Sequence, residues 1–359
     1  MQKRTFPSIT PTLFLSFFLP FSLFQTACLP SSQRQNTHEL TPGDSLSREI
    51  AAAAPVDSLQ LVSVIYGTEE SPMELPTSLV WLPDSLGGKM YVVDTRRGSL
   101  HVIGRDASYE EEWQPEGLEY PYVAGVRGDT LVLLNRGHNR LDFIWEAEII
   151  RSVLLREEEI SSALVTDSAI FVKRSDENAI RLLRVSESGE TQASYELPGP
   201  YWRHIGFLRA WGDSLLSLSG FRPVVDVLPM DAPDGTISDS MALVGFDSPQ
   251  LVRSNQYMLG EVDQPPLLVS SVAPFGDNLY VLNLRADGIR IDVYGREGRI
   301  ERALAYLDVE ALPNAFPVDI AVRQDGAGLL FALVMQNPGG LLNDPSGYIL
   351  MLRWDRPSA

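Results

Sequence analysis

Cysteine, lysine and histidine are scarce in this chain of 359 residues, and their scarcity excludes several kinds of site. Cys28 is the only cysteine, so the chain cannot form an internal disulfide framework. Only three of the 29 basic residues are lysines, and none of the four histidines stands at the spacing of a metal-binding pair. Phosphate-binding loops and serine-nucleophile motifs are also missing. The sequence therefore predicts no cofactor and no metal.

Basic residues are also few relative to acidic ones, and the formal net charge is −18. Such a surface repels a phosphate backbone, so we expect no nucleic-acid partner. Hydrophobic residues make up 44% of the chain, which is typical of a globular protein with a packed core.

Long hydrophobic runs are missing except near the N-terminus. Lys3 and Arg4 precede a twelve-residue apolar run from 13 to 24. That run is too short to cross a bilayer but has the length of a secretory signal. Residues 1–27 are therefore predicted to be a signal peptide.

The signal ends in "LFQTAC", where small residues Thr26 and Ala27 precede Cys28. This ending resembles bacterial lipoprotein signals, although Gln25 departs from the usual leucine. The resemblance implies a lipid attached to Cys28 and a place in the bacterial cell envelope. Leu29 resembles the residue found in lipoproteins sent to the outer membrane, facing the periplasm or the outside. The alternative is a secreted protein with a free thiol.

Residues 28–56 are polar, with proline, serine and a short alanine run, and are predicted to be a flexible tether between anchor and domain.

The rest of the chain repeats one pattern, seen in "GDNLYVLNLRADGIRIDVYGREG" from 276 to 298. A Gly or Asp turn is followed by an alternating apolar strand, a polar turn and usually another strand. Successive copies are 39 to 64 residues apart. Repeats of about 40 residues with four short strands are typical of propeller blades. The turns that mark the six copies are Gly88, Gly128, Asp167, Asp213, Asp277 and Gly326.

We therefore predict an all-β fold, a six-bladed β-propeller over residues 57–356. Its blades resemble those of the NHL and lactonase-like propeller families. The last blade has only three clear strands, so the strand at 59–67 is predicted to complete it beside 347–354. The longest repeat has an apparent insertion at 221–239.

Lactonase-like propellers hold a divalent cation at the axis, which the resemblance would place at the segments "LPTSLVW" and "FPVDIAV". Thr77 stands where that family has a glutamate. Val318 stands where it has an aspartate, and Asp319 follows one residue later. Because neighbouring residues of a strand point to opposite faces, this metal set is not intact. Enzymatic activity is therefore not predicted.

Arginine recurs in the turn between the second and third strands of five repeats. Such turns share one face of a propeller, where guanidinium groups suit carboxylates and phosphates. The alternative is that arginine is simply the common cation here and pairs with nearby acids. The predicted ligand-binding residues, including a neighbouring histidine and a tryptophan suited to sugar stacking, are Arg97, Arg136, His138, Arg174, Arg222, Arg285 and Trp202.

Two functions remain open at this point. One is a lipid-anchored binding or scaffold module for an extracytoplasmic protein or anionic glycan, touching the membrane only through its anchor. The other is a lactonase-like hydrolase or lyase with an altered metal site at the axis.

Overall fold

The computed structural model describes residues 41–175, 180–197, 199, 201–233, 235, 239–308, 315–337 and 347–355. Cys28 and the predicted signal peptide lie outside these residues. None of the described helices is long and apolar enough to span a membrane.

Two sheets contain the first twelve strands after the N-terminal segment. A four-stranded sheet has the order β3-β4-β5-β6, and an eight-stranded sheet has the order β10-β9-β8-β7-β11-β12-β13-β14. The eight-stranded sheet consists of two antiparallel halves that meet at one residue pair, Gly125 and Val165. The strands are β3 (Pro76–Trp81), β4 (Met90–Asp94), β5 (Ser99–Ile103), β6 (Tyr109–Trp113), β7 (Pro121–Arg127), β8 (Thr130–Asn135), β9 (Arg140–Trp145), β10 (Glu148–Leu154), β11 (Ile160–Val165), β12 (Ile170–Ser175), β13 (Ile180–Val185) and β14 (Thr191–Glu196).

Three further sheets follow, with the orders β15-β16-β17-β18, β1-β22-β21-β20-β19 and β2-β25-β24-β23. Their strands are β1 (Val56–Ser58), β2 (Gln60–Ile65), β15 (Leu208–Trp211), β16 (Ser214–Leu218), β17 (Val224–Pro229), β18 (Asp239–Ala242), β19 (Val269–Phe275), β20 (Asn278–Asn283), β21 (Ile289–Tyr294), β22 (Ile300–Tyr306), β23 (Phe316–Asp325), β24 (Gly328–Gln336) and β25 (Gly347–Trp354). Two short 3-10 helices, η3 (Asp84–Leu86) and η4 (Tyr201–His204), lie in connections.

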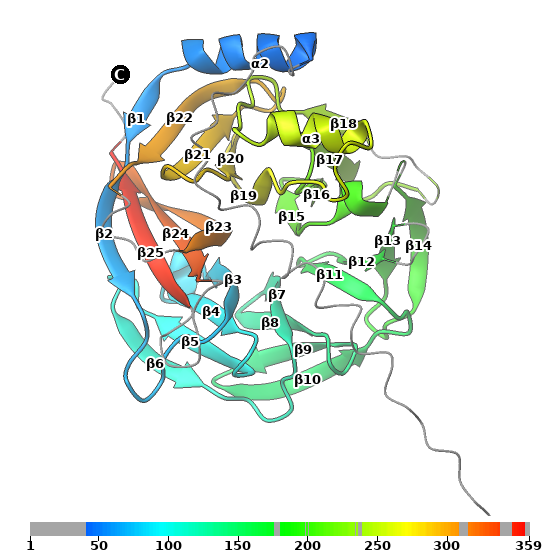
Figure 1. Ribbon diagram of the computed structural model, residues 1–359. Helices are drawn as coiled ribbons and strands as arrows, with labels where there is room; N and C mark the ends of the chain where they lie inside the picture. Colours follow the sequence, from blue (N-terminus) through cyan, green and yellow to red (C-terminus); the bar gives the residue numbers. More distant parts are fainter. Residues whose placement is uncertain are drawn as a thin grey trace, which may run out of the picture. The chain divides into compact units, whose positions relative to one another are not determined.

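The sheets surround a common axis (Figure 1). Their innermost strands contact one another in a closed order: β3, β7, β11, β15, β19, β23 and back to β3. Apolar side chains alternate along the strands and pack between neighbouring sheets. The predicted all-β propeller is confirmed.

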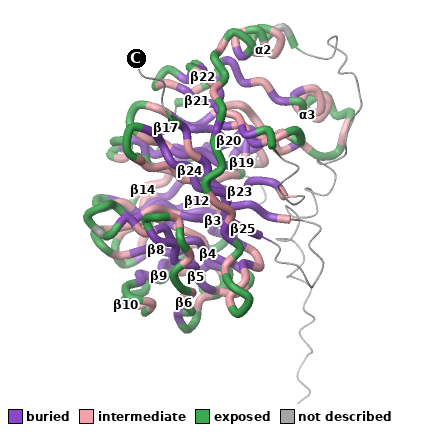
Figure 2. Tube along the Cα trace, turned by 90° about the vertical axis from the view of Figure 1, so that its left-hand side faces the viewer, coloured by how far each residue is buried: buried purple, intermediate pink, exposed green. Residues whose placement is uncertain are grey.

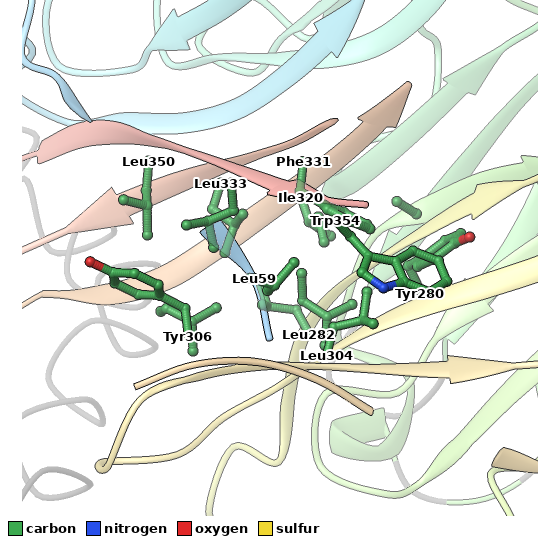
Figure 3. Packing of buried hydrophobic residues seen from close by; sticks show 14 of the residues in the cluster. Leu59, Tyr280, Leu282, Leu304, Tyr306, Ile320, Phe331, Leu333, Leu350 and Trp354 are labelled. Atoms are coloured by element: carbon green, nitrogen blue, oxygen red, sulfur yellow. The ribbon is translucent and has the colours of Figure 1, made fainter. Parts of the chain in front are cut away.

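The two ends of the propeller sequence join in one sheet. β2 pairs antiparallel with β25, as the sequence predicted, and forms the outer strand of that sheet. β1 pairs in parallel with β22 of the neighbouring sheet. Leu59, between β1 and β2, is buried with Tyr306, Ile320 and Leu350 in a cluster that both sheets share (Figure 3).

The structure corrects the described part of the predicted tether. Residues 42–53 form a helix, α2 (Pro42–Ala53), which starts with a capping box between Thr41 and Asp44. Ala51 is buried, and Ile50 packs against the core between two sheets. The alanine run was predicted to be part of a flexible tether, but alanine is the strongest helix former and fits where a helix must lie close to a sheet. The ordered domain therefore begins before residue 57.

The predicted insertion at 221–239 is also wrong in its placement. That stretch includes β17, and β18 begins at its end. The extra length lies instead between β18 and β19, where the chain forms α3 (Leu251–Met258). Figure 2 shows α2 and α3 on the same side of the strands.

Candidate functional site

The turns between second and third strands share one face with the connections from each four-stranded unit to the next, because the strands within each unit are antiparallel. We call this face the loop face. All seven predicted ligand-binding residues belong to its turns, strand ends or connections. The axis and the loop face are therefore the two candidate sites.

The axis carries a buried polar network around Asp319 of β23. Its Oδ1 accepts hydrogen bonds from Arg209 Nη2 at 2.5 Å and Ser271 Oγ at 2.6 Å. Its Oδ2 accepts the backbone N–H of Leu79 at 3.1 Å. Asp319 thus joins strands β15, β19 and β3 to β23, and its oxygens are occupied by donors from the protein.

Other innermost strands are joined in the same way. Ser78 Oγ accepts the N–H of Val123 at 2.9 Å, and Ser162 Oγ accepts the N–H of Leu208 at 3.3 Å. Five innermost strands change register near their start, including β23 between Pro317 and Asp319. Such bulges turn a side chain toward the neighbouring strand.

The two positions that the lactonase resemblance singled out are both engaged. Thr77 is buried, and its hydroxyl lies 2.5 Å from that of Thr95, which donates to Pro121 O. Asp319 holds the network just described. In the part of the chain that the structure describes, no three acidic, histidine or cysteine side chains form a group that could hold a metal.

Lys173 of β12 is the least expected buried charge. Its Nζ donates to the carbonyl oxygens of His204 at 2.9 Å and Gly206 at 2.8 Å, so it fastens the connection that enters the next unit. Burial lowers the pKa of Lys173 to about 7, against the opposing effect of Asp226.

Asp226 holds the same connection through side chains. It accepts from His204 Nδ1 at 2.9 Å and from Arg203 Nη2 at 3.0 Å, while Ser240 Oγ donates at 2.7 Å. Burial opposes the charge on Asp226, but these hydrogen bonds lower its pKa. Lys173, His204 and Asp226 are almost completely buried, so their arrangement serves to position the connection.

Arg97 and Arg285 are tied to carboxylates that the fold brings near. Arg97 makes a two-pronged contact with Glu112, at 2.7 and 3.0 Å, and a bond to Glu74 at 3.1 Å. Burial alone would raise the pKa of Glu112, but the hydrogen bonds from Arg97 and other groups lower it to about 2. Arg285 Nη2 donates to the backbone oxygen and the carboxylate of Asp247. These two arginines stabilise turns of the loop face.

Arg136, His138 and Arg174 make contacts of other kinds. The Arg136 guanidinium lies over the Tyr122 ring, 5.3 Å from its centroid. His138 Nε2 lies 3.6 Å from a carboxylate oxygen of Glu119, and both side chains are about half exposed. Arg174 Nη1 bonds Glu157 at 3.0 Å, and each of these side chains is 30% exposed. Exposed ion pairs of this kind contribute only about 0–1 kcal/mol.

Arg222 and Trp202 lie together on another sector, beside α3. Trp202 meets Tyr257 of α3 edge-on at 5.2 Å and Phe221 at 6.5 Å. Arg222 Nη1 lies 3.8 Å from the sulfur of Met258. The predicted arginines therefore differ in their contacts. Arg97, Arg174 and Arg285 pair with carboxylates, Arg136 lies over an aromatic ring, and Arg222 lies beside α3.

No protein-family model and no curated protein sequence matches the chain. Solved structures do resemble it. A putative exported protein from Bacteroides fragilis NCTC 9343 is 10% identical, with a TM-score of 0.51 over 85% of this chain and 99% of that one. A catalytically inactive virginiamycin B lyase from Staphylococcus aureus with quinupristin is 13% identical, with a TM-score of 0.51 over 82% and 99%. A streptogramin B lyase is 12% identical, with a TM-score of 0.50 over 84% and 88%. The shared feature is the propeller fold. At such low identity these likenesses concern the fold alone.

Proposed function

We propose that this protein is a lipid-anchored, extracytoplasmic propeller that binds a protein or an anionic glycan in the bacterial cell envelope. We count six blades, because the eight-stranded sheet divides into two four-stranded halves at one residue pair. The NHL and lactonase-like propellers remain its proposed relatives.

The main support for the proposal is a contrast in burial: the charged groups of the axis are buried and bonded to one another, whereas the ion pairs of His138 and Arg174 on the loop face are partly exposed. Asp319 and Arg209 bond each other and the neighbouring strands. A lactonase-like reaction would need carboxylates open to a substrate there, so the binding module is favoured over the hydrolase or lyase. His138 and Arg174, by contrast, pair with acids that are about half exposed (Glu119) or partly exposed (Glu157). An anionic ligand can replace such partners at little cost.

The partner's acidic groups are proposed to contact Arg136, His138 and Arg174. Guanidinium groups form two-pronged bonds with carboxylate, sulfate and phosphate alike, so this sector suits an acidic protein segment or an anionic glycan. Arg97 and Arg285 act indirectly, by holding the turns.

Charge reversal tests the proposed sector. An Arg136→Glu and Arg174→Glu double variant is expected to capture the partner from a solubilised envelope extract more than tenfold less well than wild type, because each charge-assisted hydrogen bond is worth about 1.5–3 kcal/mol. Binding to a panel of anionic glycans, measured in parallel, distinguishes the two partner classes.

The control variant is Arg151→Glu. Arg151 lies on the outer strand β10, where it pairs with Glu187 at 2.8 Å, away from the loop-face turns. Reversing the charge of Arg151 should leave capture of the partner unchanged. Equal losses from the double variant and from Arg151→Glu would show that only the overall charge matters, and the proposed sector would be rejected.

A further inference from the structure

A second part of the loop face exposes apolar side chains around the end of α3. Leu259 is 74% exposed, Met258 51% and Ile205 41%. Ile205 follows η4, whose Trp202 packs against Tyr257 of α3, so these side chains come from adjoining segments. We call Ile205, Arg222, Arg253, Met258 and Leu259 the α3 rim. Exposed apolar side chains gathered at one place mark a contact surface.

The arginines of the α3 rim differ from most of those elsewhere on the loop face. Among the described residues, neither Arg222 nor Arg253 has a carboxylate partner. Arg222 contacts the Met258 sulfur, and Arg253 is partly exposed, with a buried Nε that has no hydrogen-bond partner. Arg97, Arg174 and Arg285 all have one. Arginines without carboxylate partners, on the segments that expose Leu, Met and Ile side chains, suit a surface that carries phosphate groups outside and an apolar layer beneath them.

The N-terminal segment enters the domain at this same place. Asn255 of α3 donates to Asp44 in the first turn of α2 at 2.8 Å, and Arg48 of α2 bonds Asp247 at 3.2 Å. Figures 1 and 2 show the two helices as neighbours. Only residues 29–41 separate Cys28 from the start of α2, and an extended chain of that length reaches at most about 50 Å.

We propose that the α3 rim rests on the phospholipid surface to which the chain is anchored. This rests on the proposed lipidation of Cys28. Leu259, Met258 and Ile205 enter the headgroup region, and Arg222 and Arg253 bond lipid phosphates. The exposed acids Glu261 and Asp263 oppose this contact. The tether compensates by keeping the rim at a high effective concentration near the lipid, so a weak contact suffices.

This arrangement would leave the proposed partner sector free. Figure 1 shows β8 and β9, which flank Arg136 and His138, across the axis from α2 and α3. Both places belong to the loop face, so a lipid contact confined to the α3 side would leave Arg136 and His138 across the axis from it.

Spin-label accessibility tests the proposal. The full-length Leu259→Cys protein is purified from membranes, labelled with a nitroxide and reconstituted into vesicles of phosphatidylethanolamine and phosphatidylglycerol. The measured quantity is the ratio of the label's accessibility to oxygen, which enters lipid, to its accessibility to a water-soluble nickel complex. This ratio is expected to be several-fold higher for the label at 259 than for a label on Asp213→Cys. Asp213 is an exposed turn residue at the opposite end of the sheet beside α3. When Arg222→Glu and Arg253→Glu are added to the Leu259→Cys protein, the accessibility ratio of the label at 259 should fall to that of a label in water.

Equal, aqueous accessibility at 259 and 213 would overturn the proposal. So would a label at 259 that stays aqueous on vesicles but is immobilised by an added envelope protein, because the rim would then be a protein-docking surface. The intact mass of the same sample reports acylation separately. If the mass shows no acyl group and the label at 259 is still in contact with lipid, the proposed lipidation of Cys28 is wrong, but the proposed membrane contact of the α3 rim is supported.

Discussion

Between pH 7 and pH 9, the free energy of unfolding of the wild-type protein is expected to rise by about 2 kcal/mol relative to that of a Lys173→Met variant. The reason is that Lys173 has a folded-state pKa of about 7. Below about pH 7 the amine is protonated in both states, so the difference does not change there. Between about pH 7 and the ordinary lysine pKa of about 10.5, only the unfolded chain holds the proton. Raising the pH in this interval therefore favours the folded state.

Urea unfolding of both proteins across this pH range measures the effect. Lys89→Met is the matched control, since Lys89 is a partly exposed lysine that pairs with Glu110 on the surface. Its stability difference from wild type should stay constant with pH. A constant difference for Lys173→Met as well would mean that Lys173 is charged in the folded protein over the whole range.

A Leu59→Ala substitution is expected to destabilise the protein by about 2–5 kcal/mol, the usual cost of truncating a buried leucine. Leu59 is 5% exposed and lies where the N-terminal segment passes between two sheets (Figure 3). Its N–H also donates to Ala305 O of β22. The loss would weaken the join between the two ends of the ring.

Leu61→Ala is the control, because Leu61 lies two residues away on β2 and is 42% exposed. It should change the unfolding free energy by no more than about 0.5 kcal/mol. Similar small effects of both substitutions would show that the N-terminal segment contributes little to closing the propeller.

Local patterns in the sequence were sufficient to predict most of the strands. Alternating apolar residues and Gly or Asp turns recur at each blade, and both are short-range signals. The pairing of β2 with β25 was predictable because an incomplete last blade needs an outer strand. Neither inference needs knowledge of side-chain contacts between distant segments.

The site was less predictable because its charges are decided by such contacts. Arg97 is neutralised by Glu74 and Glu112, and Arg174 by Glu157, which are 15 to 23 residues away. Lys173 directly precedes Arg174 of a predicted turn, yet the strand turns it inward toward the next unit. A lysine directly after the apolar run "IFV" was the signal that could have revealed it.

The helices were missed for a related reason. α2 and α3 have only 12 and 8 residues, and helices of that length depend on contacts such as those that α2 makes with Gly245 and with Asn255 of α3.

Membrane attachment through Cys28, as proposed, is tested by fractionation of cells that carry the Cys28→Ser protein, with a high-salt wash to remove charge contacts of the α3 rim. Wild type is expected to stay with the washed membranes, and the variant is expected to move to the soluble envelope fraction. If the variant remains with the washed membranes as fully as wild type, Cys28 does not hold the protein there.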